Sequence, residues 1–348
     1  MTGSTRRARL ALPAAAALVL LASASAFAQA PAAPTFAKDV APILQRSCQN
    51  CHRPGSIAPM SLLTYEDARP WARSMKNRVS QRQMPPWHVD RTIGIRRFKD
   101  DPSLSDAEVD TIVKWVDAGA PRGNPADMPK PRVFEDTDKW HIGKPDLVVA
   151  LPKPNTIEAQ SADWWADFVS DSGLTEDRYI KAVEAKPGPG ASRVVHHAVM
   201  YLVDPDNNNP MGDLDIPAGA DNVRSDAYFK LDRNARLTAF MPHMHNRGKR
   251  QCLEAIYPNM VVEQFNCVNY DFQWQIVYNY ADDVAPLLPA GTIMHVTSWH
   301  DNSAGNRNNP DPRNWVGFGN RTTDDMARHW LTFYYMSDDE FQAEVRTR

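Results

Sequence analysis

The chain has little net charge, few cysteines and, beyond its first thirty residues, no long apolar run. A formal net charge of −3 over 348 residues offers no basic surface, so we expect no nucleic-acid partner. No stretch after residue 30 approaches membrane-spanning length, so we expect no membrane span. Glycine is modest at 16 and proline abundant at 28, which is typical of many loops and turns without low complexity.

The first residues have the pattern of a secretory signal peptide. Arg6, Arg7 and Arg9 form a positive start, residues 10–26 are apolar and rich in alanine and leucine, and small residues follow. We predict a signal peptide over 1–28 and therefore a periplasmic or secreted protein. A membrane anchor is the alternative, but the run is short and cleavage-type residues follow it directly.

Residues 33–120 are predicted to form a small helical domain. Thr35 can cap a helix whose apolar residues recur at helical spacing. Pro70 occupies the position of a first-turn proline, and Ser105 with Glu108 has the spacing of a capping box for a further helix. Three short helices around a Cys-x-x-Cys-His motif are how a small cytochrome c is organised.

That motif is Cys48-Gln49-Asn50-Cys51-His52. Its two thiols can add to the vinyl groups of a haem, and the adjacent histidine is then held beneath the iron as the fifth ligand. A zinc site would need a second cysteine or histidine pair nearby, and the sequence has none. A thioredoxin-type redox pair would need a βαβ setting. We therefore predict one covalent haem c bound by Cys48, Cys51 and His52.

Met84 is the predicted sixth ligand of the haem iron. It lies in Arg82-Gln83-Met84-Pro85-Pro86-Trp87, where two prolines stiffen the backbone. Met60, His88 or an open position are the alternatives, while Met75 falls on a helix face that core packing explains better. A Met/His pair raises the reduction potential, which suits electron transfer better than oxygen binding.

Beyond residue 120 the helical pattern ends. Residues 121–140 combine prolines with charges and are predicted to be a linker. Short β-type runs separated by turn-forming clusters follow, which favours β-sandwich architecture. These runs cover residues 147–151, 194–203, 237–240, 293–299 and 330–335.

Cys252 and Cys267 bracket two strand-like runs joined at Pro258-Asn259. Cysteines at opposite ends of a hairpin face each other, and an exported protein meets an oxidising compartment. We therefore predict a disulfide, with two buried thiols as the alternative.

Four of the ten histidines stand in two clusters. His243 and His245 are two apart on a predicted strand, so both side chains can bind one ion from the same face. His196 and His197 are adjacent and would face opposite sides unless the strand is irregular there. Imidazole-rich sites without thiolate favour copper or zinc. Ordinary structural histidines are the alternative, although two clusters in one exported domain favour metal.

Three segments together resemble a known family, the copper type II, ascorbate-dependent monooxygenases that include peptidylglycine hydroxylating and dopamine β-monooxygenases. The closer match is to bacterial exported members with a fused cytochrome c, and it covers nearly the whole mature chain. The segments are His196-His197-Ala198-Val199-Met200, residues 240–249 around His243-Met244-His245, and Asp324-Asp325-Met326.

The resemblance implies two jelly-roll-like β-sandwich domains, 141–222 and 223–348, each holding one copper. It assigns His243, His245 and Met326 to the copper that activates oxygen, and His196 and His197 to a second copper that relays an electron. Two imidazoles with a soft thioether favour Cu(I) and leave a position open for oxygen. We therefore expect hydroxylation of a C–H bond of a small organic substrate. Electrons would come through the haem from an ascorbate-like reductant or a redox protein.

The chain departs from the family in the first copper-type domain. The family supplies a third histidine to the relay copper between the two motifs, whereas this sequence has none between His197 and His243. Residues 141–222 are too few for a complete sandwich, so we expect a shortened domain and one or two coppers in all. The histidines that might complete the relay site are His141, His295, His300 and His329.

Two other functions compete with the monooxygenase. One is a non-catalytic periplasmic cytochrome that transfers electrons and binds copper, having lost catalysis with the missing segment. The other is a zinc hydrolase, which is weaker because His243-Met244-His245 lacks the helical His-Glu-x-x-His setting.

Overall fold

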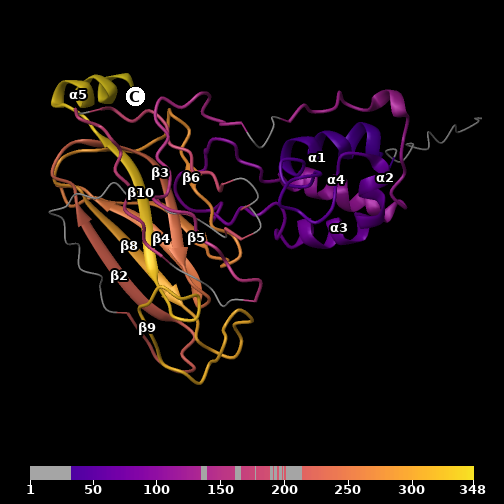
Figure 1. Ribbon diagram of the computed structural model, residues 1–348. Coiled ribbons are helices and arrows are strands. Elements are labelled where there is room, and N and C mark those ends of the chain that lie inside the picture. Colours follow the sequence, from indigo (N-terminus) through magenta and orange to yellow (C-terminus); the bar gives the residue numbers. More distant parts are fainter. Residues whose placement is uncertain are drawn as a thin grey trace, which may run out of the picture.

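The computed structural model describes residues 33–134, 139–160, 166–176, 178–188, 191, 194–195, 198, 200 and 214–348. The predicted signal peptide over 1–28 and the His196–His197 pair lie outside the described residues. The described chain begins with helices, continues through a loop-rich segment and ends in antiparallel sheets (Figure 1).

The N-terminal helices lie close to their predicted positions, although the Thr35 side chain does not cap the first one with a hydrogen bond. The Ser105 hydroxyl accepts the Glu108 amide hydrogen, and the Glu108 carboxylate accepts the Ser105 amide hydrogen at 2.8 Å, so the predicted capping box is confirmed. These helices pack around a core that includes Phe36, Leu44 and Trp115. The elements are a π-helical turn (Phe36–Val40), α1 (Ala41–Ser47), α2 (Tyr65–Ala68), a 3₁₀ turn (Arg69–Trp71), α3 (Ala72–Ser80), α4 (Asp106–Asp117) and a further 3₁₀ turn (Pro125–Asp127).

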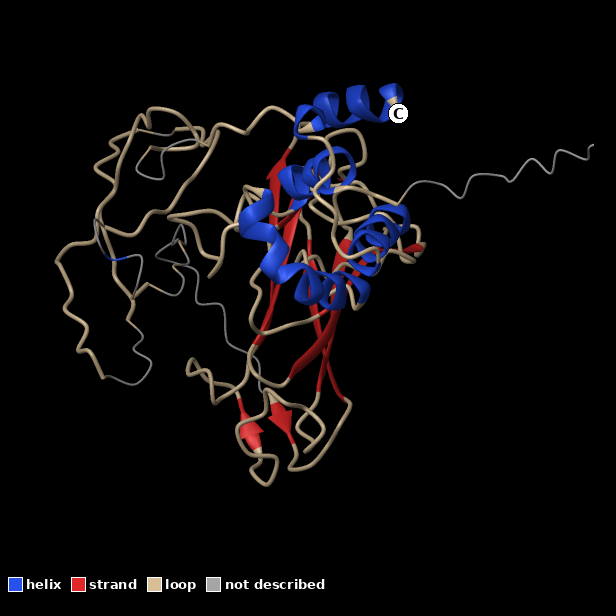
Figure 2. Ribbon diagram, turned by 90° about the vertical axis from the view of Figure 1, so that its right-hand side faces the viewer, coloured by secondary structure: helices blue, strands red, loops and turns tan. Residues whose placement is uncertain are grey.

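Two four-stranded antiparallel sheets dominate the C-terminal part. One has the order β2-β8-β4-β5, and in the other β3 lies between β10 and β6 and also pairs with β7. A two-stranded sheet, β1-β9, lies beyond them (Figure 2), and α5 (Asp338–Thr347) follows β10. The strands are β1 (Asp215–Ile216), β2 (Val223–Lys230), β3 (Ala235–Met244), β4 (Gly248–Ile256), β5 (Val262–Asn269), β6 (Tyr278–Asn279), β7 (Leu287–Leu288), β8 (Ile293–His300), β9 (Val316–Gly317) and β10 (Ala327–Tyr335).

The two larger sheets share one hydrophobic core, in which Leu237 and Phe240 of β3 meet Leu253, Phe265 and Met294 of the other sheet. This arrangement is compatible with the predicted β-sandwich. The predicted strands at 237–240, 293–299 and 330–335 are confirmed within β3, β8 and β10. Residues 147–151 differ from the prediction, since they form no strand and their side chains are exposed. The described residues of the predicted run 194–203 form no strand either.

Residues 87–99, between α3 and α4, leave the helices and pack against both sheets; we call them the bridging segment. The Asp90 and Ile95 amides donate to the carbonyls of Cys267 and Phe265 on β5, at 2.8 and 2.9 Å. The Lys99 amide donates to Asn279 of β6 at 2.8 Å. β5 and β6 each end a sheet, so the segment covers two edges that would otherwise present unpaired backbone groups.

The bridging segment also supplies side chains to the core of the sheets. Val89 is buried there, and Trp87 and Phe98 pack against the same cluster. Gly94 permits the close approach, because a Cβ built on it would lie 1.9 Å from the Phe265 carbonyl oxygen. The helical and strand-rich parts are therefore joined by packed backbone as well as by the segment around residues 121–140.

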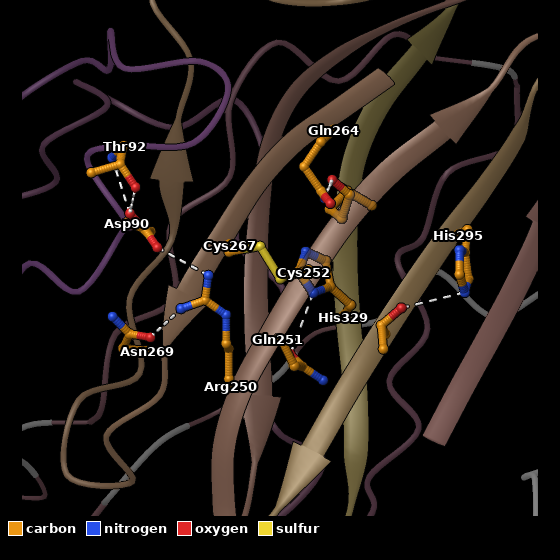
Figure 3. The surroundings of a disulfide bond; sticks show 12 residues. Asp90, Thr92, Arg250, Gln251, Cys252, Gln264, Cys267, Asn269, His295 and His329 are labelled. Atoms are coloured by element: carbon orange, nitrogen blue, oxygen red, sulfur yellow. Dashed lines mark hydrogen bonds and ion pairs between the residues drawn. A yellow bond between two sulfur atoms is a disulfide. The ribbon is translucent and has the colours of Figure 1, made fainter. Parts of the chain in front are cut away.

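The predicted disulfide is confirmed between Cys252 and Cys267 (Figure 3). The two residues are directly opposite in the β4–β5 pair, with Cα atoms 4.0 Å apart. Beside them, Arg250 contacts Asp90 of the bridging segment at 3.0 Å. A disulfide is compatible with export, and none of the described helices combines the length and apolar character needed to cross a bilayer.

Candidate metal centres

His243 and His245 lie at the end of β3, on the face turned away from the shared core. Phe240 points into that core, and alternation along the strand turns His243 and His245 to the opposite face. Across the β3–β10 pair Met244 faces Ala327, so Met326 follows at the position opposite His245. The three residues that resemble an oxygen-activating copper site are thus neighbours at one end of this pair.

These side chains are buried although they lie on an outer face. His243, His245 and Met326 are each 6% exposed. The two imidazole ring centres are 5.3 Å apart, with planes at 87°. Two imidazoles that share one ion at the usual ~2 Å metal–nitrogen distance have ring centres about 5 Å apart. The spacing therefore fits a common ion.

Gln275 fixes the tautomer of His243. Its amide nitrogen donates to the Tyr270 hydroxyl at 2.7 Å and to the Phe272 carbonyl at 3.0 Å, which orients the amide. Its oxygen then faces His243 Nδ1 at 2.8 Å. Because an amide oxygen only accepts, Nδ1 carries the hydrogen and Nε2 keeps the lone pair that binds a metal.

His245 has a different environment. Its Nδ1 is buried and has no hydrogen-bond partner among the described residues. A buried, unpaired ring nitrogen is costly unless something binds it, and a metal ion would do so. The donor set of two imidazoles and a thioether therefore fits copper.

Asp325 organises the backbone around this pair. The fully buried carboxylate accepts the amide hydrogens of His245 at 3.2 Å and Arg247 at 3.0 Å. His300 Nε2 lies 3.6 Å from the same carboxylate, and burial lowers the pKa of His300. Sequence reasoning missed Gln275 and gave Asp325 no role beyond its place in the Asp324-Asp325-Met326 segment, because their links to the histidines depend on contacts across the fold.

A cavity of about 890 Å³ is lined by residues close in sequence to the candidate ligands, although neither histidine nor Met326 lines it. Arg247 and Asp324 line it, and each is two residues from a candidate ligand. The Arg247 guanidinium is almost fully buried and donates to Asn302 Oδ1 at 2.8 Å, and burial lowers its pKa. Trp315 and Phe318 complete part of a mixed polar and aromatic lining that can accept a small organic molecule.

The other candidate copper ligands have other environments. His295 lies between the carboxylates of Glu254 and Asp226, at 2.6 and 2.7 Å, and exposed His141 contacts Glu184 at 3.0 Å. Burial lowers the pKa of His329 to about 3, so its ring is neutral. Within the described residues no group of three His, Cys, Asp or Glu side chains is placed to hold a metal. A relay site at His196 and His197 stays a prediction.

The Cys48-to-His52 motif follows the end of α1. The Cys48 amide donates to Leu44 at 2.9 Å, and the Cys48 side chain packs on the helical core while Cys51 is exposed. Neither forms a disulfide. Burial raises the pKa of Cys48 to about 12 and also raises the pKa of Cys51, so both are neutral thiols.

His52 is oriented by a carbonyl group. Its Nδ1 lies 3.3 Å from the Met60 carbonyl oxygen, which only accepts, so Nδ1 carries the hydrogen and Nε2 is the nitrogen left for iron. Met75 is buried in the helical core, in line with its predicted packing role. Met84 lies between α3 and the bridging segment, and its amide donates to the Arg78 carbonyl at 3.4 Å.

His88 also belongs to the strand-rich surroundings. Its amide donates to the Tyr278 hydroxyl at 3.3 Å, and its carbonyl accepts the Asn269 amide hydrogen at 3.1 Å. These contacts hold its backbone between β5 and β6.

No model of a known protein family matches this chain, and no curated protein matches it. The chemistry that these centres can perform therefore follows from their own residues.

Proposed function

We propose that this chain is an exported haem c- and copper-dependent monooxygenase that hydroxylates a C–H bond of a small organic substrate with O₂. The observation that carries the proposal is the buried pair His243–His245, whose rings are spaced for a common ion, with Met326 opposite His245. In this proposal the helical part is a cytochrome c domain and the large sheets form a jelly-roll-like copper domain.

Copper, when bound by His243, His245 and Met326, would supply the redox chemistry with oxygen. The residues of the chain position it and the substrate. Gln275 keeps His243 in the metal-binding tautomer, and Asp325 fixes the backbone on which His245 lies. We place the substrate in the cavity lined by Arg247 and Asp324, each two residues from a candidate copper ligand.

The electrons would enter at Cys48, Cys51 and His52. Cys48 and Cys51 are not joined in a disulfide, as thioether attachment of a haem requires, and the Met60 carbonyl orients His52 for the iron. The external donor is an ascorbate-like reductant or a redox protein. Haem attachment and the Cys252–Cys267 disulfide both suit a periplasmic or secreted protein.

Metal analysis and oxygen uptake test this function. Protein purified after export should contain one haem and one or two coppers, and should consume oxygen when a reductant is added. His243→Ala and Met326→Ala should remove copper and oxygen uptake but keep the haem spectrum. Met128→Ala, which changes an exposed methionine with no assigned role, is the matched control for Met326→Ala and should change neither.

Two outcomes would contradict the proposal. Haem and copper without reductant-driven oxygen uptake would favour the non-catalytic electron-transfer cytochrome. Zinc in place of copper, with no haem, would exclude both readings.

A further inference from the structure

The bridging segment begins three residues after Met84 and packs into the core shared by the sheets. Only Pro85 and Pro86 separate Met84, the predicted haem ligand, from Trp87. Trp87 packs against the core shared by the sheets. The chain leaves the helical part at Met84, the candidate haem ligand. Three residues later, the Trp87 indole packs in the strand-rich part, which contains the candidate copper ligands.

A continuous row of rings begins at Trp87. Its centre is 4.8 Å from that of Tyr278 on β6, which is 5.1 Å from Phe240 on β3. Phe240 stacks on His329 of β10 at 5.5 Å, with planes only 7° apart. All three steps lie in the range of direct aromatic contact. Tyr278 and Phe240 are each 1% exposed, so the middle of the row is dry.

Hydrogen bonds continue the row to the candidate copper site. His329 Nδ1 lies 3.3 Å from Gln251 Oε1 (Figure 3), and the same oxygen accepts the His243 amide hydrogen at 3.1 Å. Gln251 is held by its amide nitrogen, which donates to Ser298 Oγ at 2.8 Å. The path therefore ends on the backbone of a residue assigned to the metal.

We propose that Trp87, Tyr278, Phe240 and His329 form the route by which electrons pass from the haem to the copper. This inference rests on the proposed function. With both cofactors bound, each passage would take one electron from ferrous haem iron, leaving it ferric, and give it to a cupric ion, leaving it cuprous; no covalent bond would form or break. Transfer through protein slows steeply as gaps lengthen, and this row has no gap wider than a ring contact or a hydrogen bond.

Intramolecular electron transfer in the full-length protein, loaded with haem and cupric ion, tests the route. Under anaerobic conditions the haem is reduced by a light pulse with a photogenerated reductant, and its reoxidation is followed by visible absorbance. Trp87→Leu should slow reoxidation by about tenfold or more, equivalent to at least ~1.4 kcal/mol of activation free energy. Trp87→Phe keeps a ring and should retain most of the rate.

Two further variants guard against a general folding effect. Phe265→Leu removes a ring that is 0% exposed in the same core but lies off the row, and should leave the rate unchanged. Phe240→Leu breaks the row at a second point and should slow reoxidation like Trp87→Leu. Copper-free protein should show no reoxidation. Each variant is used only if its haem spectrum and unfolding transition remain intact, and either row variant alone suffices for the test.

The outcomes separate the route from the function it serves. Unchanged reoxidation in Trp87→Leu and Phe240→Leu, with both cofactors bound, would overturn the route and leave the monooxygenase proposal standing. Equal slowing by Phe265→Leu would also overturn it, since the effect would then be general. Wild-type protein without haem or copper would overturn the proposed function and the route with it.

Discussion

Gln275 orients the His243 ring, which the spacing of the two histidines in the sequence does not do by itself. Its oxygen holds Nδ1 at 2.8 Å and thereby selects the metal-binding nitrogen. Gln275→Leu should lower copper affinity by roughly 10- to 100-fold, the usual cost of losing such an orienting partner. Copper titration against a competing chelator measures this. Gln273→Leu, an exposed change in the same loop, is the control, and equal affinities in both variants would argue against the tether.

Asp90 links the bridging segment to β4 through a pH-dependent contact. Hydrogen bonds from Thr92, together with Arg250, lower the pKa of Asp90 to about 2. A lowered folded-state pKa stabilises the protein above the unfolded value near 3.8, and this stabilisation disappears as the pH falls towards 2. Asp90→Asn should therefore cost about 1 kcal/mol at pH 7, a modest amount because solvent screens the pair.

Urea unfolding at a series of pH values measures that cost. The difference between Asp90→Asn and wild type should shrink once the pH falls below about 4. Asp127→Asn, in an exposed 3₁₀ turn, should match wild type throughout. A difference that stays constant down to pH 3 would show that the carboxylate charge is not responsible.

The relative positions of some residues were predictable because they follow from spacing within one hairpin or one strand. Cys252 and Cys267 flank one hairpin, and His243 and His245 are two apart on one strand, so alternation and pairing place them. The contacts that Gln275 and Asp325 make were not predictable, since both residues lie far along the chain from the histidines that they orient. Their contacts exist only after the sheets have formed.

At the scale of elements, Gly94 controls how closely the bridging segment approaches β5. Its φ is +56°, and a Cβ would meet the Phe265 carbonyl oxygen at 1.9 Å. Gly94→Ala should therefore destabilise the protein by roughly 2 kcal/mol or more, through strain and displacement of backbone. Thermal unfolding measures this. Gly188→Ala, with no atom near its Cβ, should be neutral, and a neutral Gly94→Ala would mean that the approach is not tight.

Some elements have a recognisable hydrophobic pattern or capping motif in the sequence, and others have neither. β3, β8 and β10 show runs of apolar and β-branched residues, and α4 begins with a capping box, so all four follow from sequence. The bridging segment has neither period, and its partners on β5 and β6 lie more than 160 residues along the chain. Its position could not be predicted from residues 33–120 alone, which read as a helical unit.

For the whole molecule, the bridging segment implies that the strand-rich part depends on the N-terminal part. A fragment 214–348 would lack it, leaving the β5 and β6 edges and the ring of Tyr278 without their cover. We expect this fragment to bind a hydrophobic dye, to unfold over a broad urea range and to aggregate.

A peptide covering 85–101, added in trans, should restore a sharp transition by pairing with both edges. The same peptide carrying Gly94→Ala should fail to do so, because its backbone cannot approach Phe265. A fragment that unfolds as sharply without peptide as the full chain does would show that the sheets fold independently. Residues 87–99 would then contact the sheets without being needed for their folding.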